Sequence, residues 1–313
     1  MRGTAVLSLL VCILAACDPA SAPTSPSGGG GSDGSVVGAM DGGSSAGDTG
    51  SNPVSGADAG SDAATPPPPP AGGGLGAILD ATTYAEMFPH RNALYTYEAF
   101  VAAAAYYPAF VSEGTTEQRK RELAAFLANI AHETTGGWDT APGGRYAWGL
   151  YFTQEVGCEA GACTQYCDAS NAQYPCKAGK TYHGRGPIQL SWNYNYGPMG
   201  ATLGVDLLSD PDALIRDGVL AFRSAIWFWM TEQSPKPSCH AVMTGQFTPS
   251  PADVAANRMP GFGLTIDIIN GGIECGWARS ASVSDRLGFY PRFTTILGVS
   301  QGDHLDCDTM QSY

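Results

Sequence analysis

The composition of the chain changes near residue 74, and this change limits how much of the chain can fold. From Asp18 to Gly74 there is no aromatic residue, no Lys and no Arg, whereas 15 Gly and 9 Pro are present. Such a segment has too little apolar surface to offset the entropy lost when its backbone is ordered. We therefore expect residues 18–79 to form a disordered tether, stiffened by the prolines 66–70, and residues 80–313 to form the folded domain.

The first 17 residues have the pattern of an export signal. Arg2 provides a basic start, residues 5–16 are apolar, and the run ends in Leu14-Ala15-Ala16-Cys17. This ending also resembles a bacterial lipobox, whose Cys becomes the lipidated first residue of the mature protein. We expect an exported lipoprotein of the bacterial envelope or cell surface, anchored to the membrane through Cys17. The alternative is a secreted protein whose cleavage site contains an incidental Cys.

The stretch after Thr115 predicts an amphipathic helix that ends at a carboxylic acid. Thr115 and Gln118 have the spacing of a capping box. One apolar stripe follows at helical spacing, formed by Leu123, Phe126, Leu127, Ile130 and Ala131. Glu133 falls at the margin of this stripe, where loss of water favours the neutral form of an acid. A neutral acid can donate a proton to a leaving oxygen, and the alternative is a solvent-exposed charge at a helix end.

The rest of the folded part reads as mainly helical. Thr96 is a candidate cap for a helix over 97–107, and residues 217–231 are apolar on all sides, as in a helix at the centre of a domain. Residues 262–269 form another apolar helical run that Asn270-Gly271-Gly272 should end, and residues 284–297 should form a last helix with a kink at Pro291. Residues 183–196 alternate in a way that suits a small β-hairpin.

A second acid, Glu155, lies in the long irregular stretch between residues 136 and 186. Hydrolysis of a glycosidic bond needs two carboxyl groups, one protonated and one ionised, on either side of the bond. Glu155 follows Thr153 and Gln154, so its surroundings are polar and it should stay ionised. A pair of Glu residues alone is weak support, because most such pairs are surface charges.

Aromatic and amide side chains around these acids are typical of sugar-binding sites. Aromatic faces pack on pyranose rings, and amides bind hydroxyl and acetamido groups. The candidates are Trp138, Tyr146, Trp148, Tyr174, Gln189, Trp192, Asn193, Tyr194, Asn195 and Asn270. Core packing is the alternative, and we prefer it for Trp148. For Gln189, Ser191 and Asn195 we prefer binding, because alternate positions of a strand-like segment share one face.

Charge and metal-binding patterns exclude several classes of function. The part from residue 75 onward carries 15 basic and 23 acidic residues, a net charge of −8, which argues against nucleic acid and is compatible with a neutral polysaccharide. His132-Glu133 begins like a zinc-protease motif, but position 136 is Gly rather than the second His. We expect no metal and no cofactor.

Seven cysteines follow the signal region, and export favours disulfides. They are Cys158, Cys163, Cys167, Cys176, Cys239, Cys275 and Cys307. Because seven is odd, one thiol stays unpaired within a monomer, and Cys239 is the isolated one. The cluster between Cys158 and Cys176 leaves zinc binding open as a minor alternative, although it lacks paired CxxC knuckles.

Several long motifs, in one order, resemble the catalytic domain of glycoside hydrolase family 19 chitinases, best known from plants. The resemblance covers nearly all of residues 80–313. The motifs are His132-Glu-Thr-Thr-Gly-Gly-Trp138, Tyr182-His-Gly-Arg-Gly-Pro-Ile-Gln-Leu-Ser191, Asn193-Tyr-Asn-Tyr-Gly197, Ala225-Ile-Trp-Phe-Trp-Met230 and Ile268-Ile-Asn-Gly-Gly-Ile-Glu-Cys-Gly276. This resemblance implies a mainly α, lysozyme-like, two-lobed domain with a long substrate cleft. It also implies endo-acting hydrolysis of the β-1,4 bonds of chitin, with inversion at the anomeric carbon.

The resemblance also assigns roles to individual residues. Glu133 would be the general acid, Glu155 the general base, and Ser191 would help to hold the attacking water. Glu274 and Arg286 would form a charge network with Glu133. Sugar subsites would be lined by His132, Thr135, Tyr174, Gln189, Tyr194, Asn195, Lys236 and Asn270. The family bridges would be Cys167–Cys176 and Cys275–Cys307, which leaves Cys158–Cys163 as an additional bridge.

The sequence departs from the plant pattern at a few positions. Tyr174 stands where the plant enzymes usually have Trp, which would weaken one stacking subsite. Tyr151 stands where they have Cys, and the loop near Asn92 lacks the partner Cys, so one family disulfide is missing. We expect a monomer that acts on chitin or chito-oligosaccharides. The alternatives are a peptidoglycan-acting lysozyme-like hydrolase, which the net negative charge disfavours, and a non-catalytic chito-oligosaccharide-binding protein.

Overall fold

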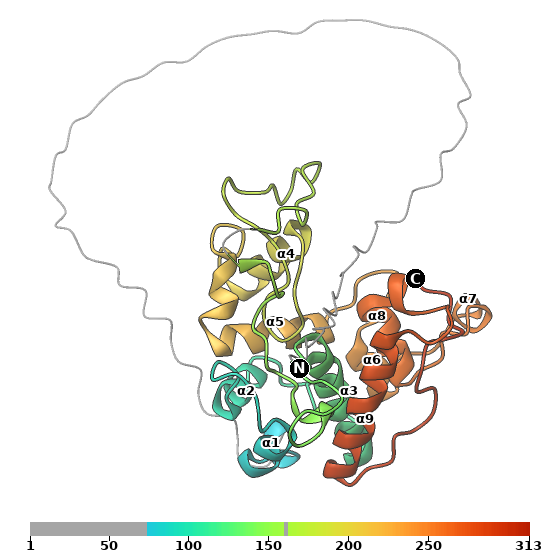
Figure 1. Ribbon diagram of the computed structural model, residues 1–313. Helices are drawn as coiled ribbons and strands as arrows, with labels where there is room; N and C mark the ends of the chain where they lie inside the picture. The colour runs from blue at the N-terminus through green and yellow to red at the C-terminus, as the bar shows by residue number, and fades with distance from the viewer. Residues whose placement is uncertain (1–73, 160–161) are drawn as a thin grey trace, which may run out of the picture. The chain divides into compact units, whose positions relative to one another are not determined.

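The computed structural model describes residues 74–159 and 162–313, and the regular secondary structure of these residues is helical apart from isolated β-bridges (Figure 1). The α-helices are α1 (Ala81–Met87), α2 (Tyr97–Ala104), α3 (Thr116–Glu133), α4 (Asn193–Leu203), α5 (Gly218–Met230), α6 (Cys239–Thr244), α7 (Pro251–Ala255), α8 (Phe262–Glu274) and α9 (Ala281–Leu297). Three short 3-10 helices accompany them: η1 (Leu75–Ala77), η2 (Arg145–Ala147) and η4 (Pro211–Ile215). The expected mainly α fold is confirmed.

The features predicted for the amino-terminal part of the chain fall mostly outside the described residues. The signal region, Cys17 and the tether up to residue 73 lie there. The tether was expected to extend to residue 79, but Leu75 and Leu79 are both buried against the core. The packing of the described domain therefore begins inside that range. No helix among the described residues is long and apolar enough to cross a membrane.

Helix α3 lies at the centre of the domain, and its predicted start is confirmed. The Thr115 hydroxyl accepts a hydrogen bond from the Gln118 backbone, and the Gln118 side chain accepts one from the Thr115 backbone. Both ends of this capping box satisfy backbone groups that a helix would otherwise leave unpaired. Phe126 then packs on Phe100 of α2 and on Trp229 of α5, with ring centroids 5.8 and 5.5 Å apart.

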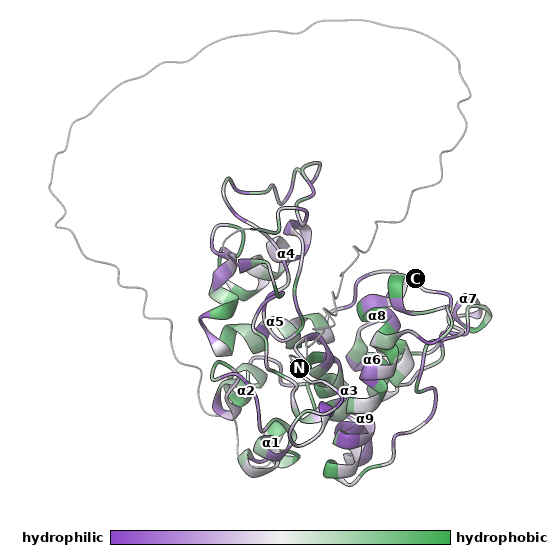
Figure 2. Ribbon diagram, viewed as in Figure 1, coloured by the Kyte–Doolittle hydropathy of each residue, from purple (hydrophilic) through white to green (hydrophobic). Residues whose placement is uncertain are grey.

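On its other side, α3 packs most extensively along α9 and also contacts α6 and α8. In Figure 1 it therefore lies between α2 and α5 on one side and the group α6, α8 and α9 on the other. Figure 2 shows hydrophobic and hydrophilic segments in turn along these helices, as expected for amphipathic helices around a shared core. This packing fixes the direction in which the last turn of α3 presents its side chains.

One predicted helix end was wrong, and one was right only in part. Helix α2 ends at Ala104 rather than near residue 107. In α8 the predicted break is present at Asn270, which leaves helical geometry with φ −145° and ψ 27°, but a further helical turn continues to Glu274. The last turn of α8 is held because the Glu274 side chain is bonded to Arg286 of α9, a tertiary contact that local sequence does not reveal.

The predicted hairpin over residues 183–196 is smaller than expected. Arg185 pairs with Leu190 across a tight turn, and Gln154 pairs with Arg185 on the other side. Trp192, with φ 73°, then turns the chain into α4. Asn195 therefore lies on a helix, and the prediction that it shares one strand face with Gln189 and Ser191 was wrong.

Candidate active site

Glu133 is the last residue of α3, and its side chain is only 1 % exposed. A guanidinium nitrogen of Arg286, from α9, donates to Glu133 Oε1 at 2.5 Å. The expected burial of this acid is therefore present. Burial is not the only influence on Glu133, however, because this carboxyl is bonded to a cation, and a bonded cation stabilises the ionised form of a carboxyl.

Arg286 is fully buried and binds three partners at once. Its Nε and one terminal nitrogen donate to the two oxygens of Glu274 at 2.9 Å each, and its other terminal nitrogen donates to Asn129 Oδ1 at 2.9 Å. Burial alone would lower the pKa of Arg286, but the carboxylates of Glu274 and Glu133 outweigh it and raise that pKa. Burial alone would raise the pKa of Glu274, but the Arg286 guanidinium outweighs burial and lowers that pKa below its usual value.

The cluster of Glu133, Glu274 and Arg286 thus contains two carboxyl groups and one guanidinium. With both acids ionised it carries one excess negative charge in a buried place, which is unfavourable. Uptake of one proton makes the cluster neutral. Asn270 contributes to the same cluster, because its amide donates to Glu274 Oε1 at 2.7 Å.

A second buried pair lies beside this cluster, and no sequence motif predicts it. Asp285 Oδ2 is 2.8 Å from His132 Nδ1, and Asp285 Oδ1 accepts from Arg145 Nε at 2.8 Å. Desolvation would raise the pKa of Asp285, but these two partners lower it. The position of Asp285 directly before Arg286 in the sequence was the available signal.

Main-chain hydrogen bonds connect the end of α3 to the segment that leads to Glu155. The carbonyl of Thr134 accepts from the amides of Tyr151 and Phe152, at 3.1 and 3.0 Å, and its hydroxyl accepts from the amide of Leu150 at 2.8 Å. From Phe152, three residues lead to Glu155, and three residues of extended chain span at most about 10 Å. The two acids therefore belong to one region of the molecule.

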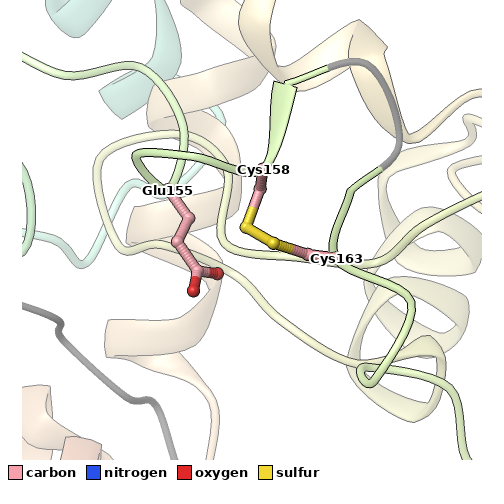
Figure 3. Close-up of side chains that lie close together, drawn as sticks. All are labelled: Glu155, Cys158 and Cys163. Atoms are coloured by element: carbon pink, nitrogen blue, oxygen red, sulfur yellow. A yellow bond between two sulfur atoms is a disulfide. The ribbon is translucent and has the colours of Figure 1, made fainter.

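Glu155 is half-buried and is held by neighbours on its own loop. Its amide donates to the Gly184 carbonyl at 2.9 Å, and the Tyr166 hydroxyl donates to Glu155 Oε1 at 2.8 Å. Figure 3 shows the carboxylate beside the disulfide between Cys158 and Cys163. Tyr166 was not among the predicted site residues, since nothing in the sequence pairs it with Glu155.

The segment after this loop brings three predicted residues together. Gln189 has φ 50°, and its side-chain amide donates to the Gly186 carbonyl at 3.0 Å. The Ser191 hydroxyl donates to the Gln189 carbonyl at 2.9 Å, and the Asn195 amide donates to the Ser191 carbonyl at 2.9 Å. Gly184 lies close to this side chain, and a Cβ at that position would lie 2.6 Å from Gln189 Oε1, so Gln189 would have to move.

The remaining predicted binding residues are spread over several elements. The Lys236 ammonium donates to the Ile268 carbonyl at 3.1 Å. Ile268 lies on α8, two residues before Asn270. Tyr174 packs against Gly197 of α4, and the Thr135 hydroxyl accepts from the Gly137 amide at 3.1 Å. Tyr194 stacks on Trp192, with ring centroids 5.5 Å apart.

The disulfide pattern expected from the family resemblance is confirmed. Bridges join Cys158 to Cys163, Cys167 to Cys176 and Cys275 to Cys307, and Cys239 is a buried free thiol. The zinc alternative is therefore wrong, because all four sulfurs of that cluster are used in bridges. His132, Glu133 and Glu274 also lie close enough to share an ion, but Arg286 is bonded to both of those carboxylates, so we read the cluster as a charge network.

Comparison with known proteins places this geometry in a family. The family model described as "Chitinase class I" matches residues 80–307. The chain belongs to glycoside hydrolase family 19. Chitinase 1 of rice (Oryza sativa subsp. japonica) is 54% identical over 250 residues, which are 78% of this chain and 76% of the rice protein. Endochitinase 3 of tobacco (Nicotiana tabacum) is 52% identical over 243 residues, which are 75% of this chain and 71% of the tobacco protein.

Solved structures of family 19 members agree with the fold. Chitinase C from Streptomyces griseus aligns with a TM-score of 0.61 at 37% identity, covering 74% of this chain and 97% of that one. The class IV chitinase from Zea mays aligns with a TM-score of 0.56 at 35% identity, covering 74% and 98%. The family 19 chain described here is thus a glycoside hydrolase with the lysozyme-like fold that its motifs predict.

Proposed function

We propose that this family 19 hydrolase is an endo-acting chitinase that cleaves β-1,4 bonds between N-acetylglucosamine units with inversion. The observation that carries the proposal is the contrast between its two acids. Glu133 belongs to a buried cluster that one proton would neutralise, whereas Glu155 is half-buried and accepts hydrogen bonds from Tyr166 and Gly184. Hydrogen-bond donors stabilise the ionised form of a carboxyl.

In this mechanism each acid moves one proton. Glu133 gives its proton to the leaving glycosidic oxygen as the bond from the anomeric carbon to that oxygen breaks. Glu155 takes a proton from a water whose oxygen bonds to the anomeric carbon from the opposite face. After the step Glu133 is ionised and Glu155 is protonated, and exchange with solvent restores both.

Arg286 has a defined role in this cycle. When Glu133 loses its proton, the carboxylate is already bonded to the guanidinium, so the new charge needs no rearrangement of the surroundings. Glu274 shares the same guanidinium, which keeps Arg286 from stabilising the ionised form of Glu133 alone. Inverting enzymes need their carboxyls about 6.5–9.5 Å apart to leave room for the water.

Binding of the sugar chain is assigned to residues on both sides of the two acids. We assign the water to Ser191, next to Gln189 and Asn195. Lys236 and Asn270 would bind the chain on the side of α8. We assign further contacts to Thr135, Tyr174 and Tyr194. The predicted contact of His132 is not supported by its side chain, which is 1% exposed and bonded to Asp285.

The substrate assignment is tested with the purified full chain and two polymers. We expect release of short N-acetylglucosamine oligomers from the chitin hexamer and little solubilisation of peptidoglycan. Turnover of peptidoglycan alone would indicate a lysozyme-like enzyme. Tight binding of the hexamer with no hydrolysis would indicate a non-catalytic binding protein.

The location of the protein is a separate part of the proposal. Three disulfides are formed in the described domain, which supports an exported protein. We assign Cys17 as the lipid anchor, and we expect a monomer, because both acids come from one chain. Mass spectrometry of the mature amino terminus tests the anchor: a diacylglyceryl Cys17 supports it, and an unmodified terminus contradicts it.

A further inference from the structure

Asp267 of α8 is a buried carboxyl without a hydrogen-bond partner. The residue is 0% exposed, and neither carboxyl oxygen has a partner among the described residues. Buried polar groups are almost always paired, and each exception calls for a physical explanation. The proposed mechanism does not use Asp267, so its role has to be found elsewhere.

The carboxyl of Asp267 rests on the bend of α8. A Cβ at Gly271 would collide with Asp267 Oδ1, so the carboxyl lies against the Gly271 backbone. The residue before that glycine, Asn270, is the one that leaves helical geometry. The Asp267 side chain therefore fills the space directly beside the bend.

This bend carries groups of the proposed active site. The Asn270 amide donates to Glu274 Oε1 at 2.7 Å, Glu274 is bonded to Arg286, and Arg286 is bonded to Glu133. On the residue next to Asp267, the carbonyl of Ile268 accepts from the Lys236 ammonium at 3.1 Å. A change at Asp267 can thus reach both Asn270 and Lys236 over one turn of helix.

Three titratable groups from other elements act on Asp267. Lys236 approaches from the loop before α6, Arg258 from the segment after α7, and Tyr313 from the carboxyl terminus. Arg258 is already bonded to Asp253 at 2.9 Å and lies over the Tyr313 ring. Burial raises the pKa of Asp267 to about 6, and the attraction of Lys236 and Arg258 only partly opposes this rise.

We propose that Asp267 is a positioning residue that, in its neutral form, holds the α8 bend and thereby the substrate-facing geometry of Asn270 and Lys236. An unpaired negative charge buried at this place favours rearrangement toward water or toward a cation. Ionisation therefore disturbs the bend, and sugar binding weakens while the chemical step at Glu133 and Glu155 is retained. This inference rests on the proposed chitinase function.

The direction of the pKa shift decides whether Asp267 stabilises the protein at low pH or at high pH. Because the pKa is raised above its usual value of 3.8, the contribution of Asp267 to stability is complete below pH 3.8. It is lost as the pH rises through about 6. In Asp267→Asn, which has nearly the same shape and no charge, this loss disappears. The variant should therefore gain stability relative to the parent protein as the pH rises from 4 to 7.

The first arm of the test measures urea midpoints of both proteins from pH 4 to pH 7.5. We expect the difference between Asp267→Asn and the parent to increase in favour of the variant through about pH 6. The matched control is Glu122→Gln, since Glu122 is equally buried but fully partnered. Removal of that charge should lower stability. A constant difference between Asp267→Asn and the parent at all pH values would overturn the inference.

The second arm measures KM and kcat for the chitin hexamer over the same range. In the parent, KM should rise by about fivefold between pH 5 and pH 7, and in Asp267→Asn it should stay nearly flat with a similar kcat. Identical KM profiles would contradict the inference, even if the stability arm behaves as expected.

If Asp267→Asn does not fold, Asp267→Ser replaces it, and a pH-independent KM in the parent alone also overturns the inference. If neither protein cleaves chitin, the proposed function has failed, and the stability arm still tests the ionisation of Asp267.

Discussion

The last turn of α3 and the loop around Glu155 each hold one carboxylic acid, but by different means. Glu133 is fixed by helix packing, because α3 and α9 lie against each other and Arg286 reaches across between them. Glu155 lies in an irregular segment, where a disulfide and the Tyr166 hydroxyl hold it. One acid is thus a part of the core, and the other depends on local cross-links.

Because of this difference, we expect substitutions near the two acids to affect the stability of the protein and its activity to different extents. Changes around Glu133 should affect folding as well as turnover, because breaking a buried charge cluster leaves an uncompensated charge. Changes around Glu155 should affect turnover with smaller effects on folding, because they remove local cross-links rather than one charge of a buried cluster.

Glu133→Gln should reduce kcat for the chitin hexamer by on the order of a thousandfold, because an amide has no proton to donate. Binding of the hexamer, measured by calorimetry, should be retained, since the shape of the side chain is kept. The control is Glu122→Gln on the same helix, a buried site that we place outside the machinery. Undiminished turnover in Glu133→Gln would remove this residue from its role.

Replacement of both Cys158 and Cys163 by Ser should lower kcat/KM by about tenfold, because Glu155 is no longer held against the bridge. The loop closed by this bridge is short, so the loss of stability should be about 2 kcal/mol in the chain-entropy model. The comparison variant replaces Cys275 and Cys307, whose loop of 32 residues should cost more stability, about 3–4 kcal/mol. The opposite ranking of the two urea midpoints would contradict this expectation.

Tyr166→Phe removes a single hydrogen bond to Glu155 Oε1 and keeps the ring that packs edge-on against Trp192. We expect kcat/KM to fall by about fivefold, corresponding to about 1 kcal/mol for one hydrogen bond. An unchanged kcat/KM would show that Tyr166 does not act on the base.

The smallest effect is expected at the other end of α3, where His240 contacts Glu122 at 2.6 Å and Glu113 at 3.1 Å. Burial lowers the pKa of His240, but the two carboxylates outweigh it and raise the pKa above 6.5. The stabilisation is therefore complete below pH 6.5 and is lost as the pH rises through the folded value. Thermal unfolding between pH 6 and pH 9 should show a decline in Tm that Glu122→Gln makes shallower. An equal decline in both proteins would assign the pH dependence to other groups.

The sequence predicted those features of the fold that depend on neighbours in the chain. The capping box of Thr115 and Gln118 and the helix cap Thr96 are local hydrogen-bond patterns, and both are present. The end of α8 could not be read in this way, because its last turn depends on Arg286 of another helix. Two consecutive glycines suggest a stop, but the tertiary bond to Glu274 overrides that local preference.

The site was predictable to a similar extent. The family resemblance pointed to Glu133 and Glu155. Tyr166, which binds Glu155, and Asp285, which binds His132 beside Glu133, come from contacts that no motif describes. Asp285 lies 153 positions after His132, so only packing of α3 against α9 reveals the pair. Asn195 was misplaced because alternating polarity was read as a strand, whereas the positive φ of Trp192 starts a helix.

The most direct test of the central claim is the anomeric form of the freshly cleaved product. Proton NMR spectra of the chitin hexamer, recorded in the first minutes after addition of the full chain, report this form before mutarotation. An acid at Glu133 and a water-activating base at Glu155 predict the α-anomer at the new reducing end. Initial release of the β-anomer would show retention and would contradict the assignment of Glu155 as a general base.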